Sequence, residues 1–302
     1  MRNFPRELQA EIRRTLSGSP DTPPEWAEKF AQGKDPGLYR PGSAVWAVHR
    51  GMPTLVAGIR ALLMQTLHPG VLAGVYDHSN FQEDTLGRLV RTTRWIHAVT
   101  YGSTADARAA TNAVLRIHES VRGQYVDGAG VTRDYSANDP ELLRWVHVAF
   151  TDSFLAVHRR WGGPIPGGPD AYVREWAEAG RLMGIESPPL RETDLVEELE
   201  AWYTAGALRA DERVAETVAF IRNPPLHPLL LPGYRVLFAA AVLSLEPKYR
   251  EMLGLRNARL GPFPLPVGLA TRATLAVVRL ALGPMGPSEQ AARRRLRRLG
   301  VA

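Results

Sequence analysis

The chain has 302 residues, of which 45% are hydrophobic and 23% charged, a globular composition with enough length to bury a sizeable core. It contains no cysteine, which excludes disulfides, thiolate metal sites, cysteine nucleophiles and thiolate-ligated haem. The formal charge of +6 could favour anionic partners, but much of it lies in the last ten residues, so we expect no nucleic-acid partner.

The first 45 residues are rich in proline, glycine and charge. A short amphipathic helix is expected over residues 6–16, and the proline-rich segment that follows ends it. A second short piece is expected over residues 25–32. We therefore predict that residues 1–45 form an arm wrapped on the main body.

No apolar run of the secretory type follows Met1, and the longest apolar-rich stretch, 236–245, is about half of the ~20 residues that span a bilayer. These features predict a soluble, cytoplasmic protein.

Helical spacing of apolar residues begins at Met52 and stops at Pro69, which leaves His68 at the end of the helix. A second helix is predicted over Thr85–Tyr101, closed by Gly102. Ser103 and Asp106 form a capping-box pattern that begins a third helix, expected to end at Gly123.

Asp139 and Pro140 are a strong start for a fourth helix, expected to reach residue 160. Further helices are predicted over 170–183, 194–207, 210–220 and 232–245. No stretch shows strand alternation bounded by hairpin turns. The sequence therefore predicts an all-α single domain, with the arm at 1–45, a helical body at 46–260 and a tail at 261–302.

The tail contains an apolar stripe on a helix over Val267–Leu282 and, after a Gly/Pro break, a short helix with five arginines in six positions. The stripe consists of Leu269, Ala273, Ala276, Val277 and Leu280. A solvated terminal helix is the simpler interpretation of the arginines. The alternative is peripheral membrane contact, in which this basic tail binds anionic lipid while the stripe faces the bilayer or completes the core.

The segment from Met52 to Phe154 holds five of the eight histidines, namely His68, His78, His97, His118 and His147. Arg88, Arg91, Thr92 and Trp95 share one face of the second helix. His118 and His147 each fall among apolar residues on helices, so both histidines and the arginine pair are expected to face an apolar interior. Each histidine could simply donate to a backbone carbonyl, which is the common role of a buried histidine.

The motifs for several other metal chemistries are missing. The chain has no paired Glu-x-x-His turns for a di-metal bundle and no His-Glu-x-x-His helix. One neutral imidazole on an apolar helix face, without a thiolate, suits a single axial bond to haem iron. Nearby arginines could pair with the propionates or stabilise charge on bound dioxygen.

An ordered series of motifs gives the chain a family resemblance. The series is Arg60-Ala-Leu-Leu-Met-Gln-Thr-Leu-His68-Pro69, Asp77-His78-Ser79-x-Phe81, Asp84-x-x-Gly-Arg88-Leu-x-Arg91-Thr92, Gly102, His118, Tyr135, Asp139-Pro140-x-Leu-Leu-x-Trp145-Val-His147 and Asp152-Ser153. From about residue 42 to 250 the chain resembles the MpaB-type oxygenase family, which includes the latex-clearing rubber oxygenases.

The resemblance implies a globin-like helical core and, as in the rubber oxygenases, haem b held through iron by one histidine, which corresponds to His118. The distal Arg-x-x-Lys-Thr motif corresponds to Arg88, Arg91 and Thr92, with Arg91 in place of lysine. A guanidinium stays charged and offers no lone pair, so Arg91 can be a charge partner but not an axial ligand. His68 and His147 fit the wider family better than its rubber-cleaving branch.

We therefore expect a haem-dependent oxidase or oxygenase that uses dioxygen on a small apolar or lipid-like substrate. Arg88, Arg91, Thr92 and His68 are the predicted catalytic residues, and His118, His147, Arg88 and Arg91 are predicted to bind the cofactor. The alternative is a helical binding or scaffold protein without catalysis. An absorption spectrum with a Soret band would separate the two.

Overall fold

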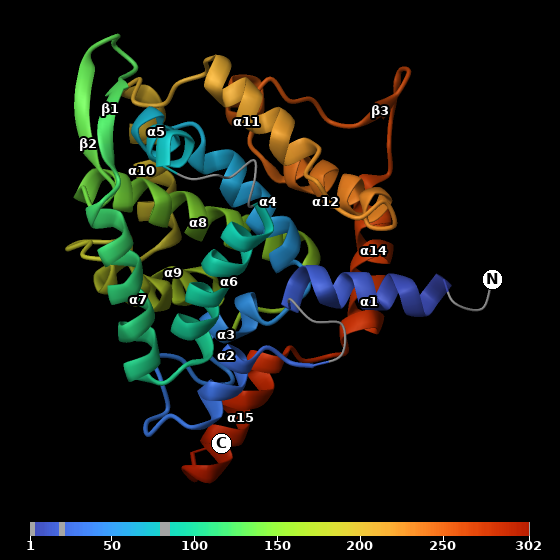
Figure 1. Cartoon of the computed structure of the whole chain (residues 1–302). Coiled ribbons are helices and arrows are strands. Elements are labelled where there is room, and N and C mark those ends of the chain that lie inside the picture. Colours follow the sequence, from blue (N-terminus) through green and yellow to red (C-terminus); the bar gives the residue numbers. More distant parts are fainter. Residues whose placement is uncertain (1–3, 18–21, 79–84, 302) are drawn as a thin grey trace.

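Helix α8 (Pro140–Trp161) crosses the middle of the molecule and carries much of the core (Figure 1). The computed structural model describes residues 4–17, 22–78 and 85–301, without the side chains of residues 4, 5, 16, 17 and 85–90. Proline at the first turn begins α8, as predicted. Along its length α8 packs against α4 (Thr54–Gln65), which is in turn covered by α12 (Leu231–Ser244).

Most predicted site residues lie on or between a group of helices and a hairpin beside α8. These elements are α5 (Pro69–His78), α6 (Thr85–Tyr101), α7 (Thr104–Glu119) and the hairpin of β1 (Arg122–Val126) and β2 (Thr132–Ser136). Ser103 and Asp106 form the predicted capping box, and they begin α7 directly after α6. The two helices therefore run antiparallel and pack against each other.

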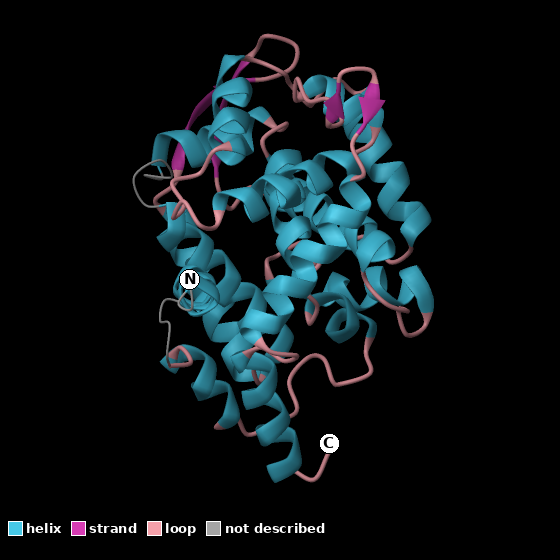
Figure 2. Cartoon of the chain, turned by 90° about the vertical axis from the view of Figure 1, so that its right-hand side faces the viewer, coloured by secondary structure: helices cyan, strands magenta, loops and turns pink. Residues whose placement is uncertain are grey.

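The remaining elements enclose the other faces of α8 and α4. They are α9 (Gly168–Leu182), α10 (Glu192–Thr204), α11 (Glu212–Arg222), α13 (Pro247–Met252), β3 (Arg259–Leu260), β4 (Phe263–Pro264) and α14 (Val267–Leu282). Figure 2 shows that helices dominate the chain, so the prediction of a mainly α-helical fold is confirmed.

The prediction that no strands exist is wrong for two short hairpins, β1–β2 and β3–β4. In β1–β2 most residues are polar or glycine, and Tyr135 is the one buried side chain. Gly123 lies opposite it, where an added Cβ would come 3.0 Å from the tyrosine ring. The hairpin thus lacks the apolar alternation by which a strand is recognised.

The N-terminal arm is held on the body by the C-terminal helices. Helix α1 (Phe4–Ser17) packs on α14, and α2 (Glu25–Glu28) with the 3-10 helix Lys29–Ala31 packs on α15 (Pro287–Arg298). Between arm and body, α3 (Ala44–His49) contacts α9 and α8.

Helix α15 is not a solvated end, so that prediction is wrong. Ala291, Ala292 and Leu296 are fully buried against Phe30 and Trp46. Three of the five arginines that suggested a solvated or membrane-bound tail bind the arm. Arg295 is fully buried and donates to the carbonyls of Phe30, Pro36 and Gly102 at 2.8–3.1 Å, while Arg298 donates to Ala31 and Gly33, and Arg294 pairs with Glu28.

The α14 stripe also differs from the expectation that it could complete the core. Its members Leu269 and Leu280 are 73% and 83% exposed. The buried face of α14 is formed instead by Val267, Thr271, Leu275, Val278 and Ala281. A one-dimensional pattern cannot choose between two apolar faces of one helix, and here the neighbours α12 and α1 cover the other face.

Among the described residues, no single helix is long and apolar enough to cross a membrane. Two consecutive pairs, α4–α5 and α14–α15, reach that length only together, and they are bent by 104° and 58°.

Candidate functional site

Three residues of the recognised motifs form a buried polar cluster between α4, α8 and α12. The Arg60 guanidinium, 1% exposed, lies 2.5 Å from an Asp152 carboxylate oxygen and donates to Ser153 Oγ at 2.8 Å. At this distance Arg60 and Asp152 form an ion pair, but the geometry of the contact does not meet the criteria for a hydrogen bond. Arg60 Nε also donates to the Ser244 carbonyl at 3.4 Å. This cluster joins three core helices, so its role is structural.

His68 occupies the turn between α4 and α5 and is 2% exposed. Its Nδ1 accepts from the backbone N–H groups of Gly70 (3.2 Å) and Val71 (3.4 Å), so the imidazole caps α5. Burial lowers the pKa of His68 to about 4, which keeps the ring neutral. Because Nδ1 is the acceptor, the ring proton is on Nε2, which can donate but has no lone pair.

His147 lies on α8 and is buried against α9. An added Cβ at Gly180 would come 3.0 Å from the imidazole, so only glycine leaves room for this ring without a shift. Burial lowers the pKa of His147 to about 4, and the charge of Arg144 acts in the same direction. The ring is neutral and tightly packed.

His118 has a different environment, near the end of α7. It is half-buried, and its Nδ1 is shielded from solvent and makes no hydrogen bond of good geometry with the described residues. The same is true of Oδ1 of Asn138, whose Nδ2 donates to the Leu115 carbonyl at 3.0 Å. Burial lowers the pKa of His118, while weak hydrogen bonding to the Asn138 side chain and the Ala137 backbone acts in the opposite direction. Two complementary buried atoms, a ring nitrogen and an amide oxygen, therefore belong to neighbouring residues.

The predicted distal residues lie on α6. The side chain of Arg88 is outside the described residues, whereas Arg91 and Thr92 are exposed, contrary to the expectation that they face the interior. One turn later on the same face, Trp95 is half-buried and donates from Nε1 to Thr111 Oγ1 on α7 at 3.2 Å. From Trp95 onward this face of α6 is covered by α7 and the core. One turn earlier, at Arg91 and Thr92, the same face is exposed to solvent.

The α6–α7 register places the predicted residues at one end of this helix pair. Because the helices run antiparallel and Trp95 meets Thr111, the seven residues from Thr111 to His118 correspond to the seven from Trp95 back to Arg88. Counted from that contact, His118 and Arg88 lie equally far along two helices that diverge toward this end (Figure 1). His68 and His147 contact other elements: the His68 ring lies against Tyr125 and Trp202, and the His147 ring lies against Gly180.

His49 lies just before the Met52–Phe154 segment and was not among the predicted site residues. This histidine is buried, with Nδ1 2.9 Å from Thr100 Oγ1 and Nε2 3.1 Å from the Tyr172 hydroxyl. Its ring lies 4.5 Å from that of Trp176, and burial lowers its pKa to about 3. The available signal was the Ser43 N-cap, which predicts a short helix that carries His49 three residues after Trp46. Its two hydrogen bonds indicate a structural role.

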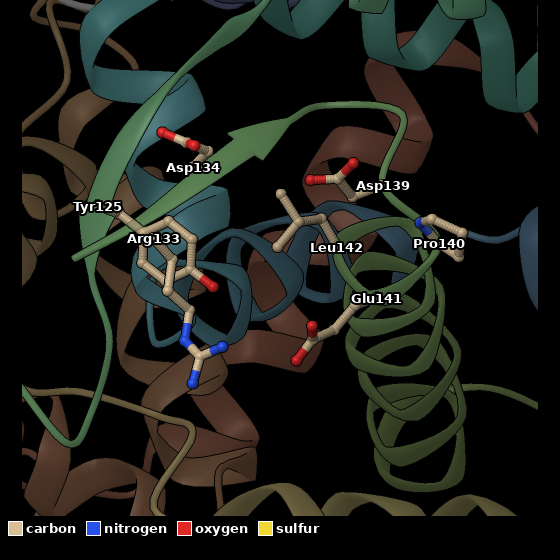
Figure 3. Close-up of a pocket in the computed structure, with 7 residues that line it drawn as sticks. All are labelled: Tyr125, Arg133, Asp134, Asp139, Pro140, Glu141 and Leu142. Atoms are coloured by element: carbon tan, nitrogen blue, oxygen red, sulfur yellow. The ribbon is translucent and has the colours of Figure 1, made fainter. Parts of the chain in front are cut away.

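A polar depression of about 470 Å³ lies beside the β1–β2 hairpin and the start of α8 (Figure 3). Tyr125, Arg133 and Glu141 are among its lining residues, and none of the predicted site residues lines it. Across the described residues, no group of three or more His, Asp or Glu side chains could hold a metal ion. A metal bound through protein side chains alone therefore has no site there, whereas a porphyrin-held iron needs only one histidine.

A comparison with protein families matches residues 46–280 to the catalytic domain described as ER-bound oxygenase mpaB/B'/Rubber oxygenase. No curated protein and no solved structure matches the chain significantly. The family match covers most of the chain, from α3 through most of α14.

Proposed function

The chain belongs to the family of mpaB/B' and rubber oxygenase catalytic domains, and from this premise we propose that it is a haem b-dependent oxygenase or oxidase. The proposed reaction uses dioxygen and a small apolar or lipid-like substrate. Membership of an oxygenase family supports the oxidoreductase class. The haem, its ligand and the substrate class are parts of the proposal.

The environment of His118 is the observation that carries the proposal. A histidine that ligates a metal usually donates its other ring N–H to a nearby acceptor, which fixes the tautomer and orients the ring. The buried Nδ1 of His118 and the nearby Oδ1 of Asn138, which approach each other without a well-formed hydrogen bond, are suited to that arrangement. With the proton on Nδ1, the lone pair is on Nε2, the atom that an axial ligand needs.

The other two histidines are less suitable ligands. Nδ1 of His68 is used by the backbone of α5, and its Nε2 carries the proton. The His147 ring is packed against Gly180 within the core. We therefore assign His118 as the proximal ligand.

When bound, haem b would supply the iron that binds and activates dioxygen. The chain's own residues would hold and surround it. The charges of Arg88 and Arg91 suit propionates or developing negative charge, and the Thr92 hydroxyl can donate a hydrogen bond. Arg91 and Thr92 are uncovered in the structure, as side chains that contact a ligand must be before it binds. His68 can donate from Nε2 but cannot accept a proton there.

The test is the haem content of purified protein, measured by absorbance and by haemochromogen titration. We expect a Soret band in the wild type and its loss in His118→Gly, with added imidazole restoring the band in the variant. His227→Ala, which changes an exposed histidine, is the matched control and should retain full haem content.

Two outcomes would contradict the proposal. Wild-type haem content in His118→Gly without imidazole would remove His118 as the ligand. A wild-type protein that takes up no haem, even when haemin is supplied to the folded protein, would remove the cofactor and favour a non-catalytic binding protein.

A further inference from the structure

The most exposed apolar side chains of the described residues are concentrated in one segment. Leu280, Leu260, Leu269 and Phe263 are 72–83% exposed, and all lie between residues 260 and 280. The next most exposed large apolar side chain, Ile117, is at 59%. Figure 1 shows β3 and α14 along the same side of the molecule.

Within α14 the exposed residues form a continuous stripe opposite the buried face. Leu269, Ala273, Ala276, Val277 and Leu280 follow spacings of four, three, one and three residues, which keeps them within one face of a helix. The opposite face packs on α12 and α1. A helix of a soluble protein usually carries polar residues on its outer face, so a second, exposed apolar face marks an interaction surface.

The charged residues of this segment are all basic. Between Glu251 and Glu289 the sequence contains four arginines and no acidic residue. All four, Arg256, Arg259, Arg272 and Arg279, are exposed. Among the described residues none of them forms an ion pair with a carboxylate, in contrast to the arginines of α15. On α14, Arg272 and Arg279 are seven residues apart and flank the stripe.

We propose that the β3–β4 hairpin and the outer face of α14 form a docking surface for an anionic lipid bilayer. In this arrangement Leu260, Phe263, Leu269 and Leu280 enter the boundary between headgroups and acyl chains, and the arginines contact anionic headgroups. This surface takes the place of the basic tail, because three of the five arginines of α15 hold the arm. It is independent of the proposed reaction.

Charge distinguishes this occupant from a second copy of the chain. A two-fold contact through this surface would bring the same four arginines of each copy close together with no acidic residue of the surface to offset them. An anionic bilayer instead complements that charge. Each basic residue near such a surface raises affinity by roughly fivefold.

The experiment is co-sedimentation of the full-length protein with vesicles of phosphatidylcholine alone or with about one third phosphatidylserine, at low and high salt. Wild type is expected to sediment with the anionic vesicles at low salt and to lose binding as salt is raised. Arg272→Gln/Arg279→Gln should weaken binding roughly tenfold or more. Phe263→Ser/Leu280→Gln should abolish most of it. Because all four side chains are exposed, melting temperatures should be unchanged.

Matched controls change exposed residues on other helices. Val196→Gln on α10 and Arg174→Gln on α9 should bind as wild type does. The proposal is overturned if wild type ignores anionic vesicles at low salt, or if the paired variants bind like the controls. It is also overturned if light scattering shows a dimer that Phe263→Ser/Leu280→Gln converts to monomer, because a second copy would then be the occupant. Haem content affects none of these readouts.

Discussion

Arg60 at the α4–α8 interface and His118 at the end of α7 both belong to the motifs that carry the family resemblance, but their surroundings differ. Arg60 is fully buried and binds Asp152, Ser153 and the Ser244 carbonyl. His118 is half-buried with an Nδ1 that makes no well-formed hydrogen bond, and Arg91 and Thr92 on the neighbouring helix are exposed.

The comparison shows that residues can belong to a family motif for two reasons: they stabilise the fold, or they bind a ligand. The Arg60 cluster is complete without any ligand, so its residues serve the fold. The α6–α7 end has polar and apolar groups that protein contacts leave uncovered, which is what a ligand-binding region requires. Substitutions should therefore affect stability in the first region and ligand binding in the second.

The largest expected effect is at Arg60. Arg60→Met leaves the Asp152 carboxylate without its partner at a site where α4 and α8 are closely packed, and breaking a buried pair in this way costs about 3–5 kcal/mol. Urea denaturation measures the free energy of unfolding. Arg60→Met/Asp152→Leu should recover much of the loss, because both charges are removed. A loss below ~1 kcal/mol for the single variant would contradict the structural role.

The next effect concerns pH and the core histidines. Burial lowers the pKa of His49 to about 3 and those of His68 and His147 to about 4, whereas histidine in an unfolded chain titrates near 6.5. Between these values the unfolded chain binds protons that the folded chain does not. Stability is therefore complete above pH ~6.5 and falls toward pH 4, by ~1.4 kcal/mol per pH unit for each histidine.

Melting temperatures recorded from pH 7 to pH 5 measure this dependence. His147→Gln should show a shallower fall than wild type, and His78→Gln, at an exposed position, should follow the wild type. A melting temperature that stays level over this range would show that the core histidines are not buried neutral.

A smaller effect is expected from a pair of helical glycines. Gly180→Ala would bring a Cβ to 3.0 Å from the His147 ring, whereas Gly58→Ala in α4 meets no atom within 4 Å. Crowding a packed core costs about 1–3 kcal/mol, and an unhindered helical Gly→Ala change gains about 0.5–1 kcal/mol. Thermal unfolding should therefore rank Gly58→Ala above wild type and Gly180→Ala below it. Equal effects of the two changes would mean that His147 is not confined by α9.

The smallest effect on stability is expected at Asn138. Asn138→Ala removes the predicted acceptor for His118 Nδ1 and should change the free energy of unfolding by no more than ~1 kcal/mol. Loss of such a supporting partner typically weakens metal binding 10–100-fold. Haem titration of the variant against wild type measures this, with melting temperature recorded in parallel. Unchanged haem affinity would remove Asn138 from the site.

The helices were predictable where local chemistry decides them. Ser103 with Asp106, and Asp139 with Pro140, gave the starts of α7 and α8 correctly because caps act within one turn. The burial of α15 was not predictable, because the same pattern of five arginines occurs whether the side chains face water or bind backbone carbonyls. Two of the carbonyls that Arg295 binds, those of Phe30 and Pro36, lie more than 250 residues earlier in the chain.

The candidate site was predictable only in part. Helical spacing correctly grouped Arg91, Thr92 and Trp95 on one face, but it could not show that this face is covered at Trp95 and uncovered one turn earlier. No sequence pattern marks Asn138 as a site residue. It lies in the connection between β2 and α8, and only the folded chain brings it next to His118. The assignment of His118 to iron stays a prediction.

Arg295 has a consequence for the timing of folding during synthesis. Its guanidinium binds carbonyls of Phe30, Pro36 and Gly102, and Gly37 (φ +83°) leaves room where a Cβ would meet the Gly102 oxygen at 2.2 Å. On a ribosome the arm therefore waits for α15 while about 260 further residues are added, roughly 13–50 s at bacterial or eukaryotic elongation rates. Throughout that interval the apolar face of Trp46 and Phe30 that α15 covers stays exposed, and a chain interrupted before residue 287 would keep it exposed.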